Sequence, residues 1–239
     1  MSKALSRQAT LDLHGRRVAV RFLRNRRARR IILRLDQDPD GADDVVVVTL
    51  PARTAPEEGL DLVREKADWV LSRLEGLAPR ITFVNGAVVP LGGVDHVIRH
   101  TAETRGVVRL EAQEILVAGG PEHLARRVRD WFRAEARDRI RPRVRDKALV
   151  LGCTPGRVTI RDTKSRWGSC SHDGNLSFCW RLVMAPEWVL DYVVAHEVSR
   201  LAEHNHGPRF WRLVGQLTAD VDKGRDWLSR HGEGLHRIG

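Results

Sequence analysis

The pattern of apolar residues changes at Gly119-Gly120-Pro121, and this change constrains the fold more than any other feature of the chain. Before it, most apolar residues lie in short alternating stretches, which have the period of a half-buried strand. After it, most apolar residues recur every three or four positions, as they do on one face of a helix. We therefore expect an α+β fold, in which a strand-rich N-terminal part precedes helices packed around a small sheet.

The part before this change is expected to form a strand-rich N-terminal region over residues 16–118, preceded by a tail over residues 1–15. Its clearest strand is the β-branched run Val45–Leu50. A helix over 56–76 interrupts the strands, because its first residue is a proline, which is suited to a first helical turn. Short strands with glycine turns return over 81–118. The sequence contains no internal repeat.

The part after the change, residues 121–239, is expected to form a second domain. Asp173-Gly174 is typical of a tight hairpin turn. In chain order, the expected elements are a helix over 121–150, a strand over 157–161, a strand over 176–183 that returns from the hairpin, a helix that begins at Pro186, and a last helix that contains Phe210 and Leu217.

Composition limits the classes of protein to which the chain can belong. It has 239 residues, of which 42% are hydrophobic and 30% are charged, so most of it should fold. It has no apolar run of the length of a membrane span (about 18 residues) and only three cysteines, so we expect a cytoplasmic protein with no membrane partner. The net charge is +10, which predicts at most weak, nonspecific binding of nucleic acid.

Residues Val193–Arg200 nearly match a metal-binding helix. In a His-Glu-x-x-His helix, two imidazoles one turn apart bind zinc, and the Glu takes a proton from the metal-bound water. Here His196 and Glu197 match the first two positions, but Arg200 stands where the second His should be. Because a His-Glu pair is common by chance, its meaning depends on the surrounding motifs.

Three further motifs accompany His196-Glu197 in a fixed order. Ser165–Ser171 (SRWGSCS) and Gly174–Pro186 precede the pair, and Asn205–Trp211 (NHGPRFW) follows it. This ordered set resembles the YgjP-like zinc metallopeptidase family, whose members are related to the SprT-like proteases. The resemblance implies a zincin-type catalytic domain that hydrolyses a peptide or protein substrate with a zinc cofactor.

The resemblance also assigns roles to residues. His196 matches the first zinc ligand, Glu197 the general base, and His206 the third ligand. The motifs supply four candidates for contacts with the substrate: Arg166, Trp167, Trp180 and Arg181. The sequence departs from the family at Gly207, where Ser is usual, and at Cys179, where Asn is usual.

Arg200 is the more serious departure, because a guanidinium has no lone pair for a metal and its charge repels a cation. Catalytic zinc normally has three protein ligands and a water. His204 is a candidate substitute ligand if the helix ends near residue 203. Alternatively, His204 is a loop histidine on the surface. Arg200 lies three residues from both Glu197 and Glu203, so it can pair with either on a helix.

Several functions are compatible with these motifs. The leading interpretation is a zinc-dependent metallopeptidase that Arg200 impairs, with an extended peptide docked on the strand near 176–183. One alternative is an inactive relative that binds a peptide or protein without cutting it, and another is a DNA-associated SprT-like protein. A cysteine nucleophile, Cys170 with His172 nearby, is a further chemical alternative that we do not favour, since cysteine is more often a small buried hydrophobe.

Overall fold

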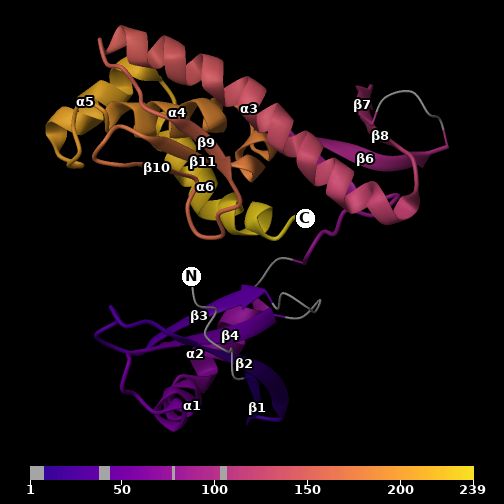
Figure 1. Ribbon diagram of the computed structural model, residues 1–239, viewed down its shortest axis with the longest axis vertical. Coiled ribbons are helices and arrows are strands. Elements are labelled where there is room, and N and C mark those ends of the chain that lie inside the picture. Colours follow the sequence, from indigo (N-terminus) through magenta and orange to yellow (C-terminus); the bar gives the residue numbers. More distant parts are fainter. Residues whose placement is uncertain (1–7, 38–43, 77–78, 103–106) are drawn as a thin grey trace. The chain divides into compact units, whose positions relative to one another are not determined.

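The computed structural model describes residues 8–37, 44–76, 79–102 and 107–239, and the chain divides into two compact units, residues 1–77 and 78–239. The sequence indicated a division at Gly119-Gly120-Pro121 instead. The division differs because the strands between residues 88 and 118 share one hydrophobic core with the helix that follows them. Figure 1 shows the elements of each unit, and each unit is described by itself.

The first unit is a four-stranded sheet with two helices. Its strands are β1 (Gln8–Leu13), β2 (Arg16–Arg24), β3 (Ile32–Gln37) and β4 (Asp44–Leu50), in the order β1-β2-β4-β3. The helices are α1 (Pro56–Glu65) and α2 (Ala67–Glu75). Val46 and Val48 of β4 and Val63 and Val70 of the helices share a buried core. The expected tail is therefore partly a strand, since β1 pairs with β2, whereas residues 1–7 lie outside the described part.

The second unit begins with a sheet of the same topology. Its strands are β5 (Val88–Leu91), β6 (Val94–Thr101), β7 (Val108–Glu111) and β8 (Glu114–Ala118), in the order β5-β6-β8-β7. In both sheets the middle pair is parallel and the two outer pairs are antiparallel. The architecture is thus repeated although the sequence is not.

A 27-residue helix, α3 (Leu124–Val150), connects this sheet to the C-terminal half of the second unit (Figure 1). Its buried residues are spaced four apart, from Leu124 to Ala148, so a single stripe that winds slowly around the helix packs on the core. The other faces are rich in arginine. In the described part of the chain, no helix combines the length and the apolar character that crossing a bilayer requires.

A second, three-stranded sheet lies beside α3. Its strands are β9 (Val158–Arg161), β10 (Gly168–Cys170) and β11 (Leu176–Cys179), and β11 lies in the middle. The prediction that an extended peptide docks on a strand near 176–183 is therefore wrong in two respects. The strand ends at Cys179, where a 3₁₀ turn (Trp180–Met184) begins, and both of its edges are already paired. The edge strand next to α4 is β10.

Three helices complete the unit: α4 (Glu187–Ser199), α5 (Pro208–Leu217) and α6 (Val221–His236). The first two match the sequence expectation, whereas α6 was not expected. Three glycines within α6 lower its intrinsic helix propensity. One of them allows close packing, since a Cβ at Gly224 would come within 2.6 Å of the Tyr192 ring of α4.

Candidate metal centre

Helix α4 places His196 and Glu197 on the side that faces β10 and α5. Its other residues are almost all buried, from Val189 to Ser199, so the helix is fixed in the core on nearly every side. Such rigid packing holds functional side chains in one geometry. His196 is half-buried, and its ring contacts the rings of Phe210 and Trp211 at centroid distances of 4.9 and 5.8 Å.

His206 comes from the turn that precedes α5, and it meets His196. The two Nε2 atoms lie 3.2 Å apart, and the ring of His206 is exposed. Two nitrogens that each bind one tetrahedral zinc at about 2.0–2.1 Å would be about 3.3 Å apart. The structure therefore brings together the two histidines that the sequence proposed as ligands, at a spacing that fits a shared metal ion.

Both histidine nitrogens need lone pairs to bind a metal. Burial lowers the pKa of His196 to about 4, and the charges of His206 and Arg200 act in the same direction. His196 is thus neutral at pH 7. Its Nδ1 is buried and has no hydrogen-bond partner among the described residues. The usual support of a metal-binding imidazole by a second hydrogen bond is consequently missing.

Glu197 is the most buried charged group near the pair, with 5% of its surface exposed. It packs against Gly168 of β10, where a Cβ atom would come within 2.5 Å of the Glu197 Cγ. Burial raises the pKa of Glu197 to about 7, although the positive charges of Arg200 and Arg166 lower it. A carboxyl group that exchanges its proton near neutral pH suits a general base.

Arg200 caps the C-terminal end of α4 and is half-buried. Its Nε is buried without a hydrogen-bond partner, and among the described residues it makes no ion pair with Glu197 or Glu203. Glu203 instead lies 3.9 Å from Arg209. Arg200 nevertheless lies close enough to Glu197 and His196 for its charge to lower both pKa values. A permanent cation thus stands beside the histidine pair.

His204 does not join the histidine pair. It is exposed, and its ring lies 5.4 Å from that of His172. Cys170 lies on the same side of the sheet as Glu197, and burial raises the pKa of its thiol, with the Glu197 charge acting in the same direction. A raised pKa disfavours the thiolate, so nothing here favours a cysteine nucleophile.

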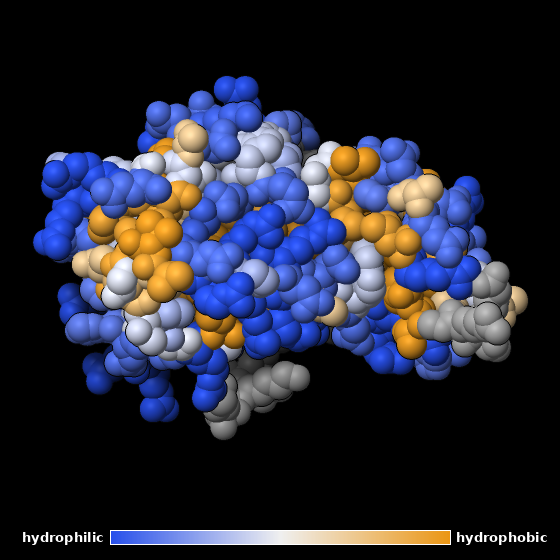
Figure 2. Space-filling model, turned by 90° about the horizontal axis from the view of Figure 1, so that it is seen from above, coloured by the Kyte–Doolittle hydropathy of each residue, from blue (hydrophilic) through white to orange (hydrophobic). Residues whose placement is uncertain are grey.

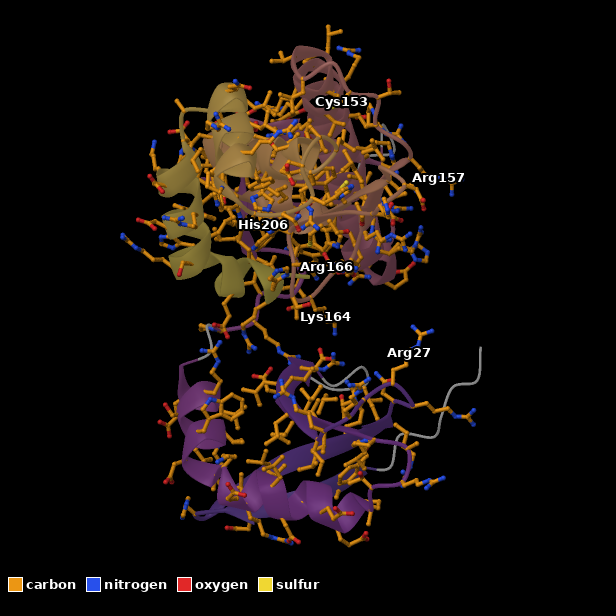
Figure 3. The ribbon with its side chains drawn as sticks, turned by 90° about the vertical axis from the view of Figure 1, so that its left-hand side faces the viewer. Arg27, Cys153, Arg157, Lys164, Arg166 and His206 are labelled. Carbon is orange, nitrogen blue, oxygen red and sulfur yellow. The ribbon has the colours of Figure 1, made fainter. Side chains whose placement is uncertain are left out.

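The four substrate candidates divide into two groups. Arg166 is exposed and close enough to affect Glu197, and it lies on the same side of the unit as His206 (Figure 3). Trp167 is half-buried and stacks on His236 at a centroid distance of 4.1 Å. In contrast, Trp180 and Arg181 are 0% and 2% exposed, so neither is available to a substrate.

Sequence reasoning did not assign a role to Gly168 or to the aromatic pair Phe210–Trp211. Both lie inside motifs that it did identify. The glycine makes room for Glu197, and the rings pack against His196 and His206. The proximity of these motifs depends on the packing of β10, α4 and α5 together, so spacing along the chain does not reveal it.

The donor set is the test of whether zinc fits. Two imidazoles with suitable spacing are present, but Arg200, which stands where the motif predicts the second histidine ligand, carries a guanidinium that cannot coordinate a metal. In the part of the chain that the structure describes, no three His, Cys, Asp or Glu residues are grouped so that they could hold a metal ion. The residues therefore supply two of the three protein ligands that a catalytic zinc site needs, and they do not fit a complete site.

Comparison with known proteins identifies the family. A family model described as the YgjP-like metallopeptidase domain matches residues 29–231. Neither the curated proteins nor the solved structures include a significant match. Since the matched segment spans most of the 239 residues, including every motif around His196 and Glu197, the chain belongs to the YgjP-like metallopeptidase family.

Proposed function

We propose that this chain binds extended polypeptide beside α4 and hydrolyses it weakly or not at all. The observation that supports this proposal is Arg200, which stands where the family motif predicts a second histidine ligand and whose charge acts on His196. Two imidazoles hold zinc far more weakly than three ligands do, and the nearby positive charge weakens binding further. The family's substrate class, peptide or protein, carries over as the proposed ligand.

The edge of β10 supports a polypeptide as the ligand. Strand β10 pairs with β11 on one side only, and it is an outer strand of its sheet. An unpaired strand edge binds an extended peptide through backbone hydrogen bonds. A peptide added there would pass Glu197, because Gly168 of β10 packs against that side chain.

A second candidate function is an active zinc peptidase. It is favoured by the 3.2 Å spacing of His196 and His206 together with a buried carboxyl group at Glu197. DNA association, the remaining alternative, has only the net charge of the chain in its favour, and we do not propose it.

The test compares zinc content and peptidase activity in the original chain, Arg200→His, and the double variant Arg200→His/Glu197→Gln. We expect substoichiometric zinc and negligible casein hydrolysis in the original chain. Arg200→His should bind zinc stoichiometrically and hydrolyse casein, and the double variant should keep the zinc without turnover. One tightly held zinc with casein hydrolysis in the original chain would establish the second candidate instead.

Binding is measured separately from hydrolysis. Unfolded casein should bind the original chain, and Cys170→Pro in β10 should weaken that binding, since the register of β10 and β11 points the Cys170 N–H to the free edge and proline removes it. The matched control is Ile160→Pro in β9, the opposite edge of the same sheet, because the Ile160 N–H likewise points away from β11. Equal loss in both variants would show that sheet damage, rather than the β10 edge, explains the effect.

A further inference from the structure

A groove runs along the C-terminal half of α3, beside β9, which is the outer strand of the three-stranded sheet opposite β10. Helix α3 ends with two bonds, Gly152 N–H to the Leu149 carbonyl and Cys153 N–H to the Ala148 carbonyl. This is the Schellman arrangement, and it uses the positive φ of Gly152 (62°). The chain therefore turns back sharply, and residues 153–158 run beside the helix that they have just left.

The space between the helix and this returning segment, here called the α3 groove, has a volume of about 670 Å³. Pockets that hold small ligands measure about 300–1,000 Å³, so the α3 groove can take several side chains. Its floor and walls are apolar, and its rim is charged. The lining residues are Val144, Ala148, Leu149, Cys153, Thr154, Pro155 and Val158, with Arg141, Arg145, Asp146 and Arg157.

The apolar part of the α3 groove continues onto the surface. Leu149 is 80% exposed and its neighbour Val150 is 68% exposed, the two highest values among the large apolar residues described. Apolar residues gather where α3 ends, at the left in Figure 2, beside a strongly hydrophilic helix face. An exposed apolar patch with a polar rim is typical of an interaction site.

The charged residues at the rim of the α3 groove determine which charge a bound segment should carry. Arg145 contacts Asp146 at 3.1 Å, so these two charges largely neutralise each other. Arg141 and Arg157 are exposed and lie within ion-pair distance of no carboxylate in the described part of the chain. Arg157 projects outward from the unit in Figure 3. The α3 groove therefore offers an apolar floor between two uncompensated cations.

We propose that the α3 groove binds a segment of another protein in which acidic residues flank apolar ones. The apolar side chains would cover Leu149 and the floor at Val144 and Ala148, and the carboxylates would pair with Arg141 and Arg157. Complementary charges of this kind on the two proteins speed their association and select the partner by its charge. This site goes beyond the proposed function, and it needs neither zinc nor Glu197.

The probe is a fluorescein-labelled synthetic peptide of alternating glutamate and leucine, measured by fluorescence anisotropy with the full chain. We expect Arg141→Glu/Arg157→Glu to weaken binding about tenfold or more, and Leu149→Ser to weaken it as well. The matched control is Arg53→Glu/Arg230→Glu, which makes the same change in net charge at exposed arginines outside the α3 groove. Circular dichroism checks that each variant remains folded.

Cys153 gives an independent readout, because it lines the α3 groove and is free. Saturating peptide should slow its alkylation in the original chain but not in Arg141→Glu/Arg157→Glu, and protection of Cys170 of β10, read in the same digest by mass spectrometry, would instead report a peptide at the β10 edge. Three outcomes would overturn the proposal. One is equal binding of a peptide with serine in place of leucine, or of single-stranded DNA, which would indicate a general polyanion surface. Another is equal loss in the control variant. The third is concentration-dependent self-association that Leu149→Ser abolishes, which would make a second copy the occupant.

Discussion

Gly168 and Glu197 are in such close contact that no side chain fits between them, because a Cβ at residue 168 would lie 2.7 Å from the Glu197 carboxylate Oε1. We expect Gly168→Ala to displace Glu197 and lower the free energy of unfolding by about 1–3 kcal/mol, the usual effect of overpacking a core. Urea denaturation measures it. Gly215→Ala in α5 is the control, because nothing lies within 4 Å of its added methyl group. Equal stability of the two variants would show that β10 can move away from α4.

Zinc binding after repair of the site should depend on His206 and not on His204. In an Arg200→His background, His206→Ala should weaken zinc binding at least about tenfold, because even the loss of a partner that only supports a ligand typically has an effect of that size. His204→Ala should leave it unchanged, because the His204 ring lies against His172 and is absent from the pair formed by His196 and His206. Isothermal titration with zinc chloride compares the variants. A loss in His204→Ala equal to that in His206→Ala would mean that the loop rearranges to bring His204 to the metal.

The pH dependence of stability should contain a contribution from His236. Burial lowers the pKa of His236 to about 4, and the Arg181 charge acts in the same direction, whereas the unfolded value is 6.5. Between these values the unfolded chain binds more protons, so stability rises with pH across this window and is lost as the pH falls from 6.5 towards 4. The loss is on the order of 2 kcal/mol.

Replacing this imidazole should flatten the curve. We expect His236→Phe, which keeps a ring against Trp167, to lose less stability than the original chain between pH 6.5 and 4. His231→Phe is the control, because His231 is an exposed residue of the same helix and also lies against a tryptophan, Trp227. Free energies of unfolding from urea titrations at several pH values give the comparison. Parallel curves for His236→Phe and the original chain would exclude His236 as the source.

Much of the secondary structure could be predicted from the sequence because local patterns determine it. Val45–Leu50 became β4, and the helix expected over 121–150 became α3, whose buried residues keep a spacing of four. Helix α6 was missed because its glycines oppose helix formation locally, and packing against Tyr192 of α4 outweighs that preference. The boundary between the units also depends on tertiary contacts, since the shared core joins β5–β8 to α3.

In the candidate site, too, the sequence does not reveal what depends on tertiary contacts. The motifs contained His196, Glu197 and His206, and the structure brings the two histidines together, with Glu197 next to His196 in α4. They also contained Trp180 and Arg181, which are buried and therefore inaccessible to a substrate. A motif records which residues are needed but not whether each is needed for chemistry or for folding. Arg181 is needed for folding, because it is buried and bonds to Asp162 and to the carbonyls of Ile238 and Gly239.

Arg181 fixes residues 238–239 through hydrogen bonds to both of their carbonyls. Its Nε donates to the Ile238 carbonyl at 2.7 Å, and its Nη1 lies 2.5 Å from Asp162 Oδ1. Burial raises the pKa of Asp162, but the hydrogen bond and charge of Arg181 outweigh this effect and hold it below its usual value. Because its removal leaves the buried carbonyl of Ile238 and that of Gly239 without this donor, while Asp162 keeps Arg133 at 3.7 Å, we expect Arg181→Met to lower the free energy of unfolding by about 1–3 kcal/mol. Arg161→Met, at an exposed arginine of β9, is the control and should change it by about 0.5 kcal/mol or less. If Arg181→Met were as stable as that control in urea denaturation, and limited proteolysis released no C-terminal fragment, Arg181 would not anchor residues 238–239, and a role in ligand binding would have to be reconsidered.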